Sequence, residues 1–242
     1  MRLDKFICKS TELTRSEAKK LLKSGEVRVN GDIEKNPSMQ VHENNNIEID
    51  GQTLTARGSR YFMLHKVADT ICSNVDEGYP SVLNFIDVDK AFDLHIAGRL
   101  DADTTGLVLI TDDGRWSHNV ISPKKECQKV YRVWLRNPIT VEKSVALIEQ
   151  FSQGIQLQGE SSLTKPAILT LVTDTDVENE VLLTIIEGRY HQVKRMFAAV
   201  GNRVIGLHRE QIGALKLANL APGKWRSLTE DEITLFQDSS LT

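Results

Sequence analysis

The sequence has few of the features that mark membrane, secreted or metal-binding proteins. Among its 242 residues, no apolar run approaches the roughly 18 residues of a membrane span, and the N-terminus carries no apolar core of the kind found in secretion signals. The three cysteines are widely spaced and include no CxxC pair, which is typical of free thiols in a reducing compartment. The six histidines never fall at the spacing of metal ligands. These absences predict a cytoplasmic protein that binds neither a membrane nor a metal.

The protein has a small excess of acidic residues, but its basic residues are concentrated in two segments of the chain. The formal net charge is −3, yet residues 1–30 hold eight Lys and Arg against four acids, and residues 120–136 hold five against one. Segregation of this kind permits a phosphate-binding face on a weakly acidic protein. A run of basic residues is also typical of a solvated helix face, so charge alone does not decide between the two.

The N-terminal residues predict two short helices. Apolar residues between Leu3 and Ile7 lie on one helical face. A second helix is expected after Thr14, because Glu17 stands three residues on and completes a capping box. Gly25 stands where a glycine cap is expected at the end of that helix.

A hairpin and a second strand complete this first module. Valines alternate with charged residues over residues 26–29, which predicts a half-buried strand, and Asn30-Gly31 predicts a type I′ turn. Another short strand is expected at residues 47–51. The short, small and basic segment that follows is typical of a linker. We therefore expect a domain at residues 1–55, a linker at 56–60 and a second domain at 61–242.

The second domain is expected to be an α+β domain with a mixed, mainly antiparallel sheet flanked by helices. Strand patterns outnumber helical patterns and do not alternate with them in a regular βαβ order. The clearest strands are predicted at residues 61–64, 107–110, 129–135, 167–172 and 181–186, and the clearest helices at 141–151 and 191–200.

The segment Gly98–Gly106, with the sequence GRLDADTTG, places a single carboxylate on a loop before an apolar strand. Asp101 follows Arg99 by two residues. Loops fixed by a rigid strand are frequent positions for catalytic groups. An aspartate in such a turn is also commonly a cap that hydrogen-bonds its own backbone.

Two further motifs carry candidate functional groups. Tyr131 lies in a predicted strand with basic neighbours. A tyrosine in a strand is a core residue about half of the time, with its hydroxyl reaching water. In the segment EGRYHQVKRMF, residues 187–197, the apolar spacing predicts a helix that begins near His191. Lys194 and Arg195 then fall in its first turn, where the helix dipole disfavours cations unless an anion lies there. Solvated surface cations are the alternative interpretation.

Together these motifs resemble those of RNA pseudouridine synthases. The pattern GRLDxxTxGL, the KxY strand and the HQVKRM helix match the three motifs, and Leu220–Thr229 near the end of the chain also fits. The order of helices and hairpin in residues 1–55 resembles the S4 RNA-binding module. The chain is identified as a member of the RsuA family of bacterial rRNA pseudouridine synthases, so we expect an S4-like module followed by a catalytic domain.

The resemblance implies isomerisation of a uridine in small-subunit (16S) rRNA, at position 516, without a cofactor or metal. It implies catalytic roles for three residues. Asp101 acts as nucleophile or base, Lys194 pairs with it where most of the superfamily has arginine, and Tyr131 lies against the target base. The implied substrate-binding residues are Arg99, Thr105, Ile185, Arg189, Gln192 and Arg195. The implied RNA-binding residues of the first module are Arg2, Arg15, Ser16, Lys19, Lys20, Lys23 and Arg28.

Two alternatives remain at this point. A large-subunit rRNA pseudouridine synthase would be expected to carry arginine in place of Lys194. A non-catalytic rRNA-binding assembly factor would be favoured by the absence of Asp101 or Tyr131, and both are present. We expect the partner to be 16S rRNA or a small-subunit assembly particle, and the protein to be a monomer.

Overall fold

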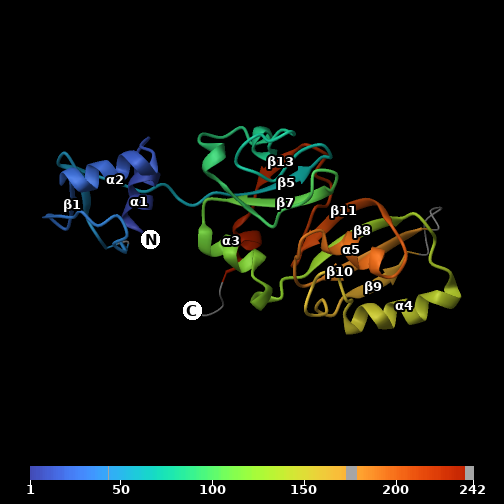
Figure 1. Ribbon diagram of the computed structural model, residues 1–242. Coiled ribbons are helices and arrows are strands. Elements are labelled where there is room, and N and C mark those ends of the chain that lie inside the picture. The colour runs from blue at the N-terminus through green and yellow to red at the C-terminus, as the bar shows by residue number, and fades with distance from the viewer. Residues whose placement is uncertain (43, 173–178, 238–242) are drawn as a thin grey trace. The chain divides into compact units, whose positions relative to one another are not determined.

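A computed structural model describes residues 1–42, 44–172 and 179–237 of the chain (Figure 1). The chain separates into two compact units, Met1–Ser59 and Arg60–Thr242. The amide of Arg57 donates to the Lys9 carbonyl, and the Lys9 ammonium donates to the Ser59 hydroxyl, so the segment before Arg60 is tied to the first unit.

The first unit packs two helices against a small sheet. The helices are α1 (Leu3–Ser10) and α2 (Arg15–Ser24). The sheet has the order β2 (Asp32–Ile33), β1 (Val27–Val29), β3 (Ile47–Ile49) and β4 (Gln52–Thr53). Its core is formed by Leu3, Ile7, Ala18, Leu22, Val27, Val29, Val41 and Ile47.

Local sequence signals account for the boundaries in this unit. The predicted capping box is present, because the Thr14 side chain accepts from the Glu17 amide while the Glu17 carboxylate accepts from the Thr14 amide. Gly25 ends α2 in the left-handed conformation at φ 82°. Asn30 and Gly31 have φ values of 54° and 91°, which is the type I′ geometry that joins β1 to β2.

The second unit is built on one large sheet. Among the described residues it has nine strands, of which seven follow the order β13-β5-β7-β11-β8-β10-β9, with β12 on β11 and β6 on β7. All pairs are antiparallel except β7 with β11, so the predicted mixed, mainly antiparallel sheet is confirmed. The strands are β5 (Tyr61–Lys66), β6 (His95–Ala97), β7 (Thr105–Thr111), β8 (Lys129–Leu135), β9 (Ile168–Leu171), β10 (Glu180–Ile185), β11 (Val204–Ile212), β12 (Leu215–Lys216) and β13 (Trp225–Ser227).

Helices cover this sheet on both faces. They are α3 (Gly114–Ile121), α4 (Val141–Gln153), α5 (Gln192–Ala199) and α6 (Glu230–Thr234), with 3-10 turns η1 (Val82–Phe85), η2 (Ala91–Asp93) and η3 (Pro123–Lys125). Figure 1 shows α4 running beside β9. Helix α5 packs against β11. None of the helices within the described ranges is long and apolar enough to cross a membrane.

The apolar run that forms β7 is buried from both sides, which explains why it is continuous. Leu107 and Leu109 belong to one core cluster, which includes Trp116 of α3. Val108 and Ile110 point the other way, into the larger cluster that also holds Phe151 and Phe197 of α4 and α5. Successive residues of a strand face opposite sides of a sheet, so four consecutive apolar residues fill both cores.

Gly106 marks the parallel junction between β7 and β11. It pairs with Arg209 and has φ 112°. A Cβ atom at this position would lie 2.3 Å from the Arg209 carbonyl oxygen and 2.5 Å from its amide nitrogen. Only glycine permits this approach of the two backbones.

Gly106→Ala is therefore expected to lower the free energy of unfolding by about 2–5 kcal/mol, from the positive φ and the backbone clash together. Chemical denaturation followed by circular dichroism measures the change. Gly114→Ala, in the first turn of α3 with open space around it, is the matched control and should stabilise by up to ~1 kcal/mol or have no effect. Equal stabilities of the two variants would contradict the assigned role of Gly106.

Candidate active site

Asp101 lies on the loop between β6 and β7. Gly98, at φ 90°, begins this loop, and the Thr104 amide closes a turn by donating to the Asp101 carbonyl at 3.1 Å. The Asp101 side chain is partly exposed, and its carboxylate is directed toward the first turn of α5. A turn between two paired strands thus presents the carboxylate.

The first turn of α5 holds the Asp101 carboxylate. The Lys194 ammonium donates to Asp101 Oδ2 at 2.9 Å, which confirms the ion pair that the resemblance implies. Lys194 also donates to Asp103 Oδ1 at 2.7 Å. His191, which precedes the helix at φ 47°, places Nε2 at 3.4 Å from Asp101 Oδ1. Each oxygen of Asp101 therefore faces a basic side chain.

The charged state of this cluster is stabilised by its own hydrogen bonds. Partial burial lowers the pKa of Lys194, but hydrogen bonds to Asp103 and Asp101 outweigh it and the pKa is raised. Burial likewise opposes ionisation of Asp103, yet the bond from Lys194 brings its pKa below the ordinary value. Lys194 is therefore a cation and Asp103 a carboxylate at neutral pH.

A cavity opens beside Asp101. It is lined by Arg99, Leu100, Asp101, Thr104, Tyr131, Ile185, Gly188, Arg189, His191, Gln192, Val193, Lys194 and Leu207. Tyr131 projects from β8 and Ile185 from the end of β10, and both are largely buried. The three residues predicted to be catalytic thus line one cavity with a charged and an apolar wall, together with Arg99, Ile185, Arg189 and Gln192.

The structure does not bring Thr105 and Arg195 into the lining of this cavity. The Thr105 hydroxyl bonds Nδ1 of His208 at 2.7 Å across the β7–β11 junction. Arg195 is held by Glu160, at 3.0 Å, and donates to the carbonyls of Gln158 and Tyr190. Both side chains are engaged within the protein.

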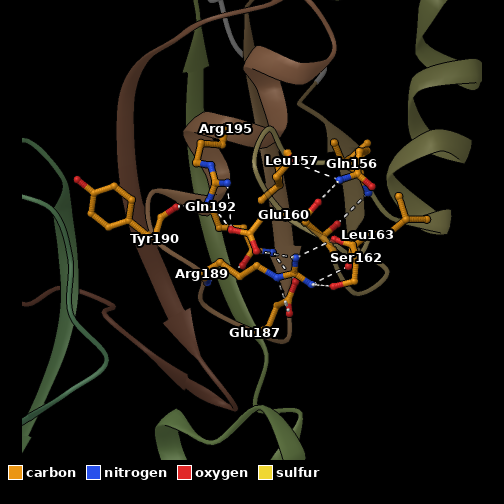
Figure 2. Close-up of polar contacts among 12 residues, drawn as sticks. Gln156, Leu157, Glu160, Ser162, Leu163, Glu187, Arg189, Tyr190, Gln192 and Arg195 are labelled. Atoms are coloured by element: carbon orange, nitrogen blue, oxygen red, sulfur yellow. Dashed lines mark hydrogen bonds and ion pairs between the residues drawn. The ribbon is translucent and has the colours of Figure 1, made fainter.

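Figure 2 shows the network that occupies Arg195 and Arg189. Arg189 donates to the carbonyls of Ser162 and Leu163 at 3.0 and 2.6 Å, and it pairs with Glu187. The Gln192 amide group donates to Glu187 and accepts from the Arg189 amide. These bonds fasten the segment after α4 to the turn between β10 and α5.

Lys66 is a buried cation that the sequence motifs do not reveal. It is only 1% exposed, and its ammonium donates to the carbonyls of Val67, Ala102 and Thr104 at 3.0, 3.1 and 2.7 Å. Burial lowers the pKa of Lys66. Ala102 and Thr104 belong to the loop of Asp101, so the hydrogen bonds from Lys66 hold that loop in place.

Arg209 is a second buried cation beside the cavity, 2% exposed. Its guanidinium donates to the carbonyls of Leu107 and Gly98 at 2.8 and 2.6 Å, and to the Tyr131 hydroxyl at 3.3 Å. One side chain thus joins β7, the start of the Asp101 loop and the tyrosine of β8. The sequence contains a signal for both cations. Lys66 follows buried Leu64 by two residues in β5, and Arg209 follows buried Leu207 by two residues in β11. Each cation therefore points to the same face of the sheet as the buried leucine before it.

The basic residues predicted to bind RNA lie at the surface of the first unit. Arg2 pairs with Asp4 through two hydrogen bonds of 3.0 and 2.8 Å. The five predicted residues of α2 are all exposed and form one stripe along the helix, separate from buried Ala18 and Leu22. They are Arg15, Ser16, Lys19, Lys20 and Lys23, and Arg28 is exposed on β1.

Lys194→Met is expected to raise the pKa of Asp103 toward its ordinary value of 3.8, because the hydrogen bond that favours the charged carboxylate is lost. In the unsubstituted protein the lowered pKa stabilises the fold above about pH 3.8, and this contribution is lost as the pH falls through the folded-state value. An NMR titration of the aspartate carboxyl carbons measures the shift.

Asp4 provides an internal control for this titration. Burial raises its pKa, but the bonds from Arg2 outweigh burial and lower it, and neither depends on Lys194. The Asp4 titration should be the same in both proteins. An unchanged Asp103 titration in Lys194→Met would show that the ammonium does not hold this carboxylate in solution.

Comparison with known families agrees with this geometry. A sequence model of the RNA pseudouridylate synthase family matches residues 60–199, and a model of the S4 domain matches residues 1–47. The first match spans the Asp101 loop, Tyr131, Lys194 and most of the cavity lining.

Similar proteins cover nearly the whole chain. Ribosomal small subunit pseudouridine synthase A of Vibrio cholerae serotype O1 is 52% identical over 234 residues, which is 96% of this chain and 98% of that protein. The protein of the same name from Escherichia coli K12 is 49% identical over 235 residues, with the same coverage of 96% and 98%. A crystal structure of a pseudouridylate synthase superposes with a TM-score of 0.68 at 47% identity and covers 98% of this chain and 100% of that one. The chain therefore belongs to the RNA pseudouridylate synthase family and is an RNA pseudouridine synthase with an N-terminal S4 domain.

Proposed function

We propose that this enzyme isomerises a specific uridine of bacterial small-subunit rRNA to pseudouridine, and that the uridine is the one at position 516. The observation that carries the proposal is the Asp101 carboxylate, held by Lys194 at the wall of a cavity that also contains Tyr131 and Ile185. The small-subunit substrate is supported by the names of relatives that are about half identical over 96% of the chain.

The isomerisation of uridine requires one charged carboxylate. The N1–C1′ bond of uridine breaks, a C5–C1′ bond forms, the hydrogen on C5 leaves as a proton and N1 gains one. The atoms balance without oxidation or net group transfer. An ionised Asp101 can attack C1′ as a nucleophile or remove the hydrogen on C2′ as a base. Both routes need a negative charge at the carboxylate, which the Lys194 ammonium contacts at 2.9 Å.

The apolar wall of the cavity suits an extruded base. A uridine must leave the RNA stack to expose C1′ and C5, which costs stacking energy that the protein has to replace. The Tyr131 ring and the Ile185 side chain offer that replacement, since both face the cavity. Arg209 fixes the Tyr131 hydroxyl at 3.3 Å, so the ring is oriented before RNA binds.

Each of the two units supplies positive charge for the RNA backbone. Arg99 lines the cavity and is exposed, so its guanidinium is accessible to a phosphate next to the target. The stripe on α2 of the S4 domain provides further cations for structured RNA. We propose that the partner is 16S rRNA or a small-subunit assembly particle, and that the enzyme acts in the cytoplasm as a monomer.

Asp101→Asn is expected to abolish pseudouridine formation, because the substitution preserves size and removes the charge. Pseudouridine in small-subunit and large-subunit rRNA is mapped at nucleotide resolution in cells that lack this enzyme and are complemented with either form. The unsubstituted enzyme should restore one modified position, and Asp101→Asn should restore none. Modification of a large-subunit uridine instead, or none at all, would contradict the proposed substrate.

Asp103→Asn is the matched control for this experiment. Asp103 also accepts a hydrogen bond from Lys194, but its side chain is largely exposed and does not line the cavity. This variant should retain most of the modification. If Asp103→Asn abolished it and Asp101→Asn did not, the catalytic role would belong to Asp103.

A further inference from the structure

Tyr190 is the exposed aromatic residue next to the catalytic carboxylate. It is 76% exposed, although aromatic rings of this size usually find cover. Its ring stacks on the His191 imidazole, with centroids 3.8 Å apart and planes at 21°. His191 in turn places Nε2 at 3.4 Å from Asp101 Oδ1. The stacked rings of Tyr190 and His191 therefore extend from the solvent to the Asp101 carboxylate.

The backbone beneath Tyr190 is held in place. Arg195 donates to the Tyr190 carbonyl at 3.0 Å, and the amide of Arg189, the residue before it, donates to Gln192 at 2.8 Å. In Figure 2 the Tyr190 ring points away from this network. The ring is thus exposed on a fixed support, and a ligand that stacks on it does not have to order the loop first.

Tyr190 lies outside the cavity that would receive the target base. The cavity lining includes Arg189 and His191 on either side of it, but not Tyr190 itself. One face of the ring is covered by His191, and the exposure of the residue leaves the opposite face open. A flat, apolar ligand next to the target uridine, rather than the uridine itself, fits this face.

We infer that Tyr190, supported by His191, is a stacking platform for the base of the nucleotide adjacent to the target uridine. Extruding the uridine removes one stacking partner from each of its neighbours. An aromatic face at the rim replaces one of these partners and does so for any base, because every base has a π-face. The platform therefore favours the extruded state of the RNA. This inference rests on the proposed function, since it takes RNA as the ligand.

The test measures stacking directly. The probe is a small-subunit rRNA fragment with 2-aminopurine placed immediately 5′ or 3′ of the mapped uridine, and the full-length protein carries Asp101→Asn to prevent turnover. Fluorescence of 2-aminopurine is quenched when the base stacks. At one of the two positions, binding to the protein with Tyr190 should quench the probe, and Tyr190→Leu should remove that quenching.

The affinity should change in parallel. Tyr190→Leu is expected to raise the Kd for the fragment by about 5- to 140-fold, which corresponds to ~1–3 kcal/mol. Tyr190→Phe and Tyr190→Trp should keep both the quenching and the affinity, because they keep the aromatic face. Melting temperatures should be equal in all variants, since the ring is exposed.

Tyr79→Leu is the matched control, because Tyr79 is also an exposed tyrosine of the same unit, at 45%, and does not line the cavity. It should change neither quenching nor Kd. Equal quenching with Tyr190→Leu, or loss of quenching with Tyr190→Phe, would overturn the platform. Failure of the proposed function is distinguishable, because it appears as absent pseudouridine with the unsubstituted enzyme, before any Tyr190 variant is compared.

Discussion

The ion pair between Lys194 and Asp101 is the contact on which the site depends, because it joins two segments that lie 93 residues apart in the sequence. The carboxylate belongs to a loop between neighbouring strands, and the ammonium belongs to the first turn of a helix that follows β10. The parallel junction of β7 with β11 lies between them in the sheet. Gly106 allows that junction to close, Lys66 fixes the loop, and Arg209 connects the loop to Tyr131. These three residues together hold the Asp101 carboxylate in position.

Sequence reasoning was most successful where a short pattern determines a local structure. The capping box of Thr14 and Glu17, the Asn30-Gly31 turn and the strand Lys129–Leu135 all occur as predicted. The same reasoning located the helix at residues 191–200 within a residue of its observed ends, Gln192–Ala199. The first-turn cations indicated that an anion lies at the start of this helix, and the resemblance to pseudouridine synthases identified that anion as Asp101.

Long-range contacts were less accessible, because the sequence does not show which segments meet. Arg195 is predicted to bind substrate, but its ion pair with Glu160, from the segment after α4, could not be predicted from the sequence. The strand pattern directs Lys66 and Arg209 inward, but it does not show which carbonyls of the Asp101 loop and of β7 accept their hydrogen bonds. His191 lay within the recognised motif, yet its approach to Asp101 follows from a left-handed backbone at φ 47°. The ion pair of Asp101 with Lys194 could therefore be predicted from the sequence. The contacts that hold it in place, such as those of Lys66 and Arg209, could be found only from the fold.

We propose that the extruded uridine enters the cavity between Asp101 and Tyr131. A crystal structure of the Asp101→Asn enzyme bound to its target RNA tests this most directly, because the nearly isosteric substitution keeps the substrate unreacted. The uracil should lie against Tyr131 and Ile185, with the ribose C1′ within about 3–3.5 Å of the side chain at position 101. A target uridine that stays stacked in the RNA, or a ribose turned away from position 101, would contradict the account.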